Sequence, residues 1–264
     1  LLHGVSTLVL LPPLFSMWRQ RRQIQRLPAL LLASFAVVLV VSGALVVGAA
    51  WGIYGKLPER LEGFLVALAG GALLLSVTTE LIQPSIEKSS VFHAMLGVGA
   101  GAIVFAICDY LIDEKWGSNG GGGLLAAITL DGIPENLALG VALIGAGGLE
   151  IAALAGSILL SNLPEAAGGA RSMAQDGRSK GKIMLLWAGT AVLLSLAAIV
   201  GNLALTGVGE GTLALIRCFA AGAVVASLAT EVFPQAFRED RHWAGIATAL
   251  GVILAFSLGS LSGG

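Results

Sequence analysis

Acidic side chains lie deep inside long apolar stretches of this sequence, where a charge is costly and usually marks a functional pathway. The deepest of them are Glu80, Asp131, Glu135, Glu165 and Glu231. They lack basic partners within these stretches, so their charge has to be neutralised by a bound cation or by protons. The chemistry that these residues predict is therefore ion binding.

The spacing of the polar residues predicts which of them lie on the same face of a helix. Asp131 and Glu135 are four residues apart and share one face of a helix. In the next apolar stretch Ser161 and Glu165 repeat that spacing, with Asn162 beside them. We therefore treat these five residues as candidate ligands of one metal ion.

A proline precedes each of the two central glutamates, in Pro134-Glu135 and in Pro164-Glu165. Proline has no amide hydrogen, so the carbonyl four residues earlier loses its helical partner. Freed carbonyls beside carboxylates form an oxygen cage that suits a divalent cation. The sequence predicts two kinked, neighbouring helices that bring both glutamates to one ion.

Each of these residues also has a plainer interpretation. A single proline in a membrane helix is most often only a kink. Asp131 is an alternative proton acceptor, and Ser161 and Asn162 are alternatives for capping a half-helix or holding two helices together. Glu80 and Glu231 lie close to span ends, so they are candidates for a gate or a proton relay, or simply solvated ends.

The composition shows which elements must position these residues. Of 264 residues 56% are hydrophobic and 12% are charged, and the mean hydropathy is +0.89. A soluble domain carries about 25% charged residues. The formal net charge is −1, which leaves no basic excess for nucleic acid. A soluble enzyme and a nucleic-acid binder are excluded, and the composition predicts an all-α integral membrane protein.

Eight stretches are long enough to cross a bilayer, which takes about 20 apolar residues each. They are 29–53, 61–84, 91–113, 121–144, 149–171, 182–205, 211–234 and 242–262. Short connections make residues 29–264 one eight-helix transmembrane domain. Residues 1–28 are predicted to be a separate N-terminal segment, interpreted as the remnant of an extra span.

Two internal repeats relate these stretches. The segment 128–135 (ITLDGIPE) matches 158–165 (ILLSNLPE) at an offset of 30, and 71–80 (GALLLSVTTE) matches 222–231 (GAVVASLATE) at an offset of 151. The matched spans are one and five apart, so they cross the membrane in opposite directions. Inverted repeats of this kind are typical of secondary transporters, whose substrate site lies near the midplane.

The basic residues indicate an orientation in a cell inner or plasma membrane. Nine of the 15 Lys and Arg residues lie in the connections after the first, third, fifth and seventh spans. The positive-inside rule places those connections in the cytoplasm. The cluster at 19–26 favours the opposite orientation.

The pattern resembles the ZIP family of divalent metal-ion transporters. That family has eight spans, and its fourth and fifth spans carry Pro-Glu motifs that correspond here to Asp131-Gly-Ile-Pro-Glu-Asn136 and Ser161-Asn-Leu-Pro-Glu-Ala166. Glu231 with Pro234, and Glu80 with Pro84, match the family's seventh and second spans. The resemblance covers residues 28–262.

The resemblance implies a single or binuclear metal site between the fourth and fifth spans, uptake toward the cytoplasm by alternating access, and often homodimers. It implies no resident cofactor, no covalent chemistry and a transported ion of the zinc, manganese or iron class. The chain departs from the family at its motif histidines, which are replaced by Asp131 and Ser161. Oxygen ligands favour ions harder than zinc, such as Mn²⁺.

Three rival functions stay open at this point. A cation/proton or cation/cation exchanger also uses Pro-Glu motifs in inverted repeats, although in separate halves. An intramembrane enzyme would need a base paired with Ser161 or Ser195, and the sequence offers none at mid-membrane. A metal sensor or scaffold would bind ions without moving them.

Overall fold

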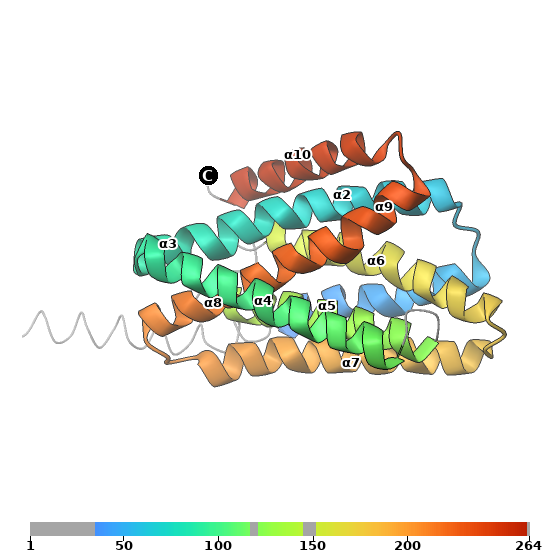
Figure 1. Cartoon of the computed structure of the whole chain (residues 1–264), viewed down its shortest axis with the longest axis horizontal. Coiled ribbons are helices and arrows are strands. Elements are labelled where there is room, and N and C mark those ends of the chain that lie inside the picture. Colours follow the sequence, from blue (N-terminus) through green and yellow to red (C-terminus); the bar gives the residue numbers. More distant parts are fainter. Residues whose placement is uncertain (1–34, 117–120, 145–151, 263–264) are drawn as a thin grey trace, which may run out of the picture.

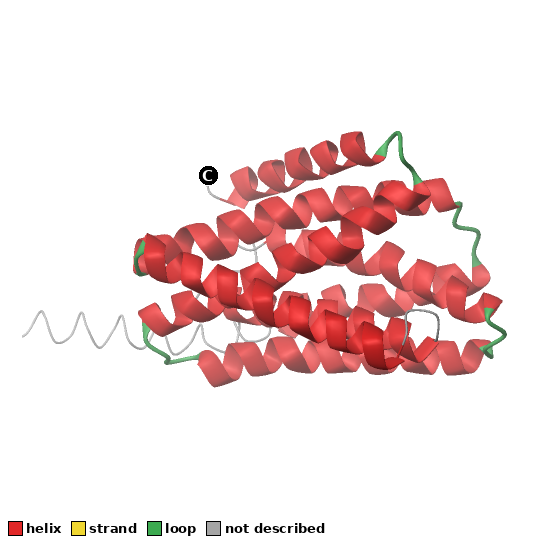
Figure 2. Cartoon of the chain, in the orientation of Figure 1, coloured by secondary structure: helices red, strands yellow, loops and turns green. Residues whose placement is uncertain are grey.

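The computed structural model describes residues 35–116, 121–144 and 152–262. Within these ranges the chain forms helices and short connections without strands (Figure 2). Helices are expected for such apolar stretches, because in hydrocarbon every backbone N–H and C=O group needs a partner inside its own segment. The all-α prediction is confirmed, whereas the predicted N-terminal segment 1–28 lies outside the described residues.

The described part of the chain forms eight helical segments, some of which consist of two helices joined by a π-helical turn (Figure 1). In chain order they are Phe35–Tyr54; α2 (Glu59–Val77) continued by the π-helical turn η1 (Thr78–Ile82) and α3 (Gln83–Lys88); α4 (Val91–Trp116); α5 (Gly121–Ala142); α6 (Ala152–Gln175); α7 (Lys180–Leu205); α8 (Glu210–Ser227) continued by the π-helical turn η2 (Leu228–Val232) and α9 (Phe233–Glu239); and α10 (Ala244–Ser262). Each of the eight predicted stretches overlaps one of these helical segments.

Five helical segments in the described part of the chain are long and apolar enough to cross a membrane. They are Phe35–Tyr54, Glu59–Lys88, Val91–Ile112, Lys180–Leu205 and Glu210–Glu239, and a shorter apolar helix spans Ala244–Ser260. Large apolar side chains such as Phe92 on α4 and Leu185 on α7 are exposed on the outside of the bundle. This surface suits lipid rather than water, and the fold is that of an all-α membrane protein.

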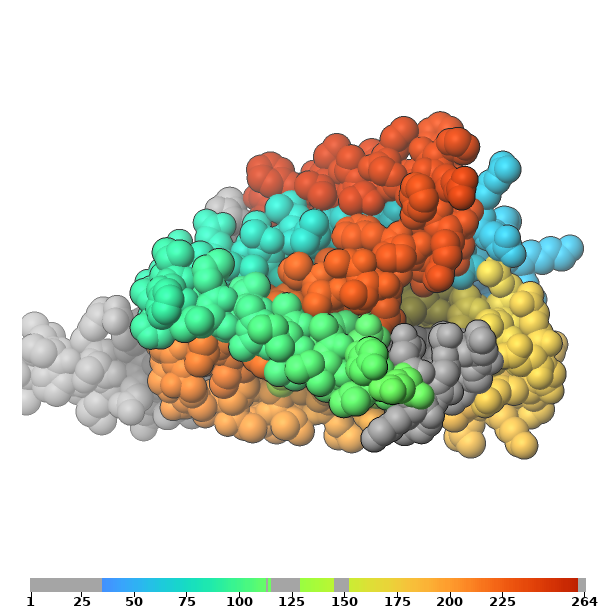
Figure 3. Space-filling model, viewed as in Figure 1, coloured from blue at the N-terminus to red at the C-terminus, as the bar shows by residue number. Residues whose placement is uncertain are grey.

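Small residues let the helices approach closely. The outer helices α4 and α10 pack along α8 and α2, and Figure 3 shows α4, α9 and α10 on one face. A Cβ atom at Gly101 would overlap the backbone carbonyl of Phe219, and one at Gly222 would overlap that of Val98. Close backbone approach of this kind replaces the hydrophobic driving force that helices lack in lipid.

We expect Gly101→Ala to destabilise the bundle by about 1–3 kcal/mol, because the added methyl group can be accommodated only if α4 and α8 move apart. Gly99→Ala on the same helix is the matched control, since a Cβ there meets nothing within 4 Å. Thermal unfolding of the two variants in detergent measures the difference. Equal unfolding midpoints would show that the α4–α8 contact is looser than described.

Candidate metal centre

The two proline-glutamate motifs lie in the interiors of α5 and α6. Pro134 lies within α5 and Pro164 within α6, and both helices continue past the proline. Glu135 is 4% exposed, and Asp131 and Ser161 are each 7% exposed. The structure therefore places these polar side chains inside the bundle rather than toward lipid.

The helices α5 and α6 are held mainly by other helices rather than by each other. The main partners of α5 are α7 and α8, and α6 packs along α2. Gly48 and Gly52 of the helix Phe35–Tyr54 lie against the backbone of α6. The direct contact between α5 and α6 is short, which differs from the extended side-by-side packing that the sequence suggests. Their acidic groups meet across the bundle centre.

Carboxyl groups on α5, α6 and η2 interact with the carboxyl group of Asp131. Its carboxyl interacts with the carboxyl of Glu231 on η2 and with the Ser227 hydroxyl on α8, and Glu135 and Glu165 also act on it electrostatically. Glu165 in turn is influenced by Glu135 and Glu231. The structure thus brings together four of the predicted acids, from α5, α6 and η2.

Within the described part of the chain, this carboxyl cluster has little positive charge beside it. The groups that act most strongly on Asp131, Glu165 and Glu231 are other carboxyls and the Ser227 hydroxyl. Arg217, the basic residue inside α8, instead donates a hydrogen bond to the Val141 carbonyl at 3.2 Å. Buried carboxyls without a basic partner need a cation or protons.

Several oxygen atoms in the cluster have unused hydrogen-bonding capacity. Asp131 Oδ1, Glu231 Oε1 and Ser227 Oγ are buried and have no hydrogen-bond partner of good geometry among the residues that the structure describes. Over the described ranges, however, no three His, Cys, Asp or Glu side chains are placed so as to hold one metal ion. Ligation by three of these carboxyls therefore requires the side chains to move closer.

Glu80 and Glu231 occupy equivalent π-helical turns but have different surroundings. Each turn precedes a proline, Pro84 or Pro234, at the start of the following short helix. The ring of a proline excludes the normal carbonyl contact four residues earlier, and the backbone widens into a π turn, a feature frequent at functional sites. Glu231 interacts with Asp131, whereas Glu80 Oε1 lies 3.5 Å from its neighbour Thr79 Oγ1.

The two candidate ligands before Pro164 have separate roles. Asn162 Nδ2 donates to the Val41 carbonyl at 3.0 Å, so this amide ties α6 to the first described helix. Ser161 lies one residue earlier, on the α6 face that also carries Ser157. The Ser157 hydroxyl hydrogen-bonds the Ser76 hydroxyl of α2 at 2.9 Å in a buried contact.

Sequence reasoning missed three polar residues around the carboxyl cluster. Asp109 of α4 interacts with Glu231. Ser227 is the residue that matches Ser76 in the second repeat, so the repeat itself carried the signal for it. Asn136 directly follows Glu135 and is fully buried, with its Oδ1 unpartnered. Its amide group donates to the Gly132 carbonyl at 2.9 Å.

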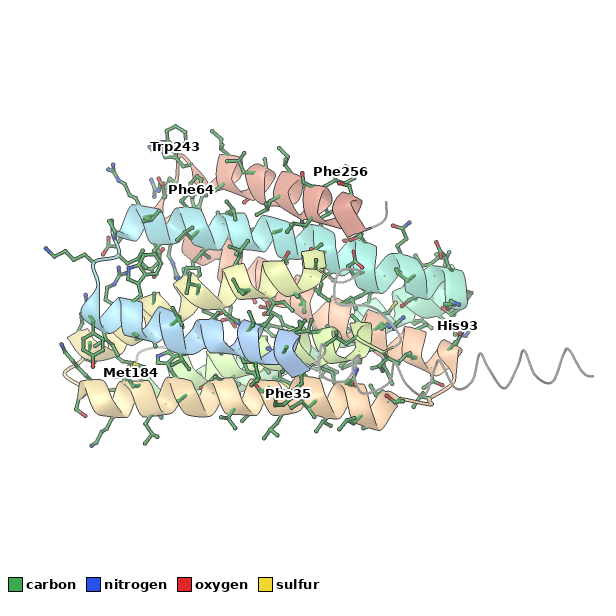
Figure 4. All side chains as sticks on the ribbon, turned by 180° about the vertical axis from the view of Figure 1, so that it is seen from behind. Phe35, Phe64, His93, Met184, Trp243 and Phe256 are labelled. Carbon is green, nitrogen blue, oxygen red and sulfur yellow. The ribbon has the colours of Figure 1, made fainter. Side chains whose placement is uncertain are left out.

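The two histidines of the described ranges, His93 and His242, lie near the ends of the bundle. Figure 4 places His93 at one end of the bundle and Trp243, next to His242, at the other. His93 is exposed, and its Nδ1 lies 2.7 Å from Ser90 Oγ. Cys108 and Cys218 are free. The candidate centre therefore consists of oxygen ligands.

Comparison with known protein families and with curated proteins finds no match for this chain. The function therefore has to be argued from the site itself.

Proposed function

We propose that this chain is a transporter of divalent metal cations, a divergent relative of the ZIP family without its motif histidines. The observation that carries the proposal is the cluster of Asp131 and Glu135, which are buried, with Glu165 and Glu231, which are half-buried. Among the described residues, the strongest electrostatic neighbours of Asp131, Glu165 and Glu231 are acidic. A cation passing through the bundle would compensate their charge. No covalent chemistry is required of the protein.

The donor atoms favour relatively hard ions. Asp131, Glu135 and Glu165 offer carboxylate oxygens and Ser161 a hydroxyl, with Asn162 adjacent, and such ligands suit Mn²⁺ or Fe²⁺ better than Zn²⁺. The ion is the substrate rather than a resident cofactor. The carboxyl groups interact with one another, but no three of them are placed to bind one ion at the same time. Such an open arrangement suits an ion that has to be released again.

The arrangement of the helical segments supports the proposal of transport by alternating access. The order of helix, π turn and proline-initiated helix occurs in both 59–88 and 210–239. The two segments run in opposite directions, because Gly63 near the start of the first lies against Glu239 at the end of the second. Opposite directions are what inverted repeats require, and we propose that these segments are such repeats in an eight-span transporter whose helices α5 and α6 are kinked at Pro134 and Pro164.

The lipid bilayer and a second copy of the chain are the partners that this function implies, and no nucleic acid is expected. The basic residues of the odd-numbered connections favour a cytoplasmic location for those connections in a cell inner or plasma membrane. Uptake toward the cytoplasm is proposed from the resemblance to the ZIP family.

Uptake of Mn²⁺, Fe²⁺, Zn²⁺ and Cd²⁺ into proteoliposomes tests the proposal. We expect saturable uptake above that of protein-free vesicles, with Mn²⁺ carried at least as fast as Zn²⁺. A pH-sensitive dye inside the same vesicles detects proton counterflow, which would favour the cation/proton exchanger instead. Binding of the ions without uptake would contradict both functions and indicate a sensor.

A further inference from the structure

An ion pair outside the carboxyl cluster lies at the end of the bundle where α2 begins and α6 ends (Figure 1). Glu62 Oε2 of α2 lies 2.7 Å from Arg171 Nη2 of α6, and the Glu62 side chain is only 2% exposed. Arg171 Nη1 also donates to the Leu57 carbonyl at 2.8 Å, which ties the connection before α2 to α6.

The surrounding residues are shaped for this pair. A Cβ atom at Gly168 would collide with Glu62 Oε1, so glycine on α6 makes room for the carboxyl group. Glu239 of α9 packs its Cβ against Gly63 and interacts with both Glu62 and Arg171. The Arg171 guanidinium of α6 therefore pairs with Glu62 of α2 and acts electrostatically on Glu239 of α9.

The opposite end of the same segments is fastened differently. There the end of α3 and the start of α8 are joined by Lys88 Nζ and Glu210 Oε2, 3.3 Å apart, with side chains 53% and 74% exposed. An exposed pair contributes little to stability, whereas breaking a buried pair leaves an uncompensated charge and is strongly unfavourable. The Glu62–Arg171 pair is therefore expected to cost more free energy to break than the Lys88–Glu210 pair.

The buried pair also terminates a polar face of α6. Small or polar residues recur every three or four positions along this helix, which places them on one face. They are Ser157, Ser161, Glu165, Gly168 and Arg171. The face includes two candidate metal ligands, and α2 covers it through the Ser76–Ser157 contact at one point and Glu62–Arg171 at the other.

We propose that Glu62 and Arg171 form a latch that holds this end of the polar α6 face closed and opens when the ion is passed. The inference rests on the proposed transport function. Opening at this end requires α2 to separate from α6, and the Glu62–Arg171 ion pair is a polar link that this movement has to break. The exposed Lys88–Glu210 pair offers no comparable resistance at the other end.

Ala69 of α2 supplies a reporter for this opening. It lies seven residues from both Glu62 and Ser76, so it shares their α6-facing side, and it is fully buried. An Ala69→Cys variant, made with Cys108→Ala and Cys218→Ala, reports access to the α2–α6 interface through its rate of modification by a hydrophilic maleimide. The measurement uses purified full-length protein in detergent without added metal.

We expect Glu62→Gln to raise the modification rate at position 69 by at least about tenfold, because glutamine keeps the shape but loses the ion pair. Lys88→Gln at the opposite end is the matched control and should leave the rate unchanged. An equal increase in both variants would indicate general loosening and would overturn the latch.

Gly168→Ala tests the latch without removing a charge, because its methyl group displaces the Glu62 carboxyl from α6. We expect faster modification here as well, in protein that stays monodisperse on size exclusion. Unchanged rates in folded Glu62→Gln and Gly168→Ala would overturn the latch. Since labelling needs no metal, failure of wild-type uptake would contradict the transport function alone.

Discussion

Replacing Glu135 with glutamine is expected to lower divalent-cation uptake by about a hundredfold. Glutamine preserves the size of this 4%-exposed side chain but removes the negative charge that would bind the ion. Loss of an outer-shell partner alone typically costs a metal site about 10–100-fold, and loss of a ligand costs at least as much. Initial rates of Mn²⁺ uptake into proteoliposomes measure the effect.

The control for this variant is Glu87→Gln on α3, which neutralises an exposed acid and should transport like the wild type. Thermal unfolding separates ligand loss from misfolding. Without metal, Glu135→Gln should be at least as stable as the wild type, because it removes a buried group that ionises unfavourably. Saturating Mn²⁺ should stabilise only the wild type strongly, by about 2.7 kcal/mol at a hundred times Kd. Uptake within twofold of the wild type would remove Glu135 from the site.

The helices were predictable because each one satisfies a local rule. A run of about 20 apolar residues forms a spanning helix whatever its neighbours are, so Lys180–Leu205 was expected at 182–205. The ends at proline were less predictable. Pro84 and Pro234 were taken to close their spans, but each lies at the start of a further short helix after a π turn.

The gathering of acids was predictable only in part. Their cost in an apolar environment marks Asp131, Glu135 and Glu165 from sequence alone. Asp131 interacts with Glu231, although the two residues are 100 positions apart in the sequence. Helical periodicity does not indicate which helices pack against each other.

The burial of Glu62 and the direction of the Asn162 amide were unpredictable for the same reason. Glu62 owes its place to Gly168 and Arg171 on a different helix. Asn162 faces Val41 through a hydrogen bond that its own motif does not specify.

The two repeat-related glutamates provide the second strong prediction, because matching positions have different neighbours. Glu231 acts on Asp131 and Glu165, whereas the side-chain partner of Glu80 is Thr79. We expect Glu231→Gln to reduce Mn²⁺ uptake by about tenfold, as removal of a residue that supports a metal ligand does. Glu80→Gln should reduce uptake by no more than about twofold.

This pair of variants controls for position, since both glutamates lie in π turns four or three residues ahead of a proline in segments with the same element order. A general effect of neutralising an acid in such a turn would lower both rates equally. Equal rates would therefore show that Glu231 acts as its repeat partner does, and that its contact with Asp131 contributes nothing to ion passage. A loss confined to Glu231→Gln instead extends the ion site from α5 and α6 to η2, so that the segment 210–239 and the ion are coupled through one carboxyl group.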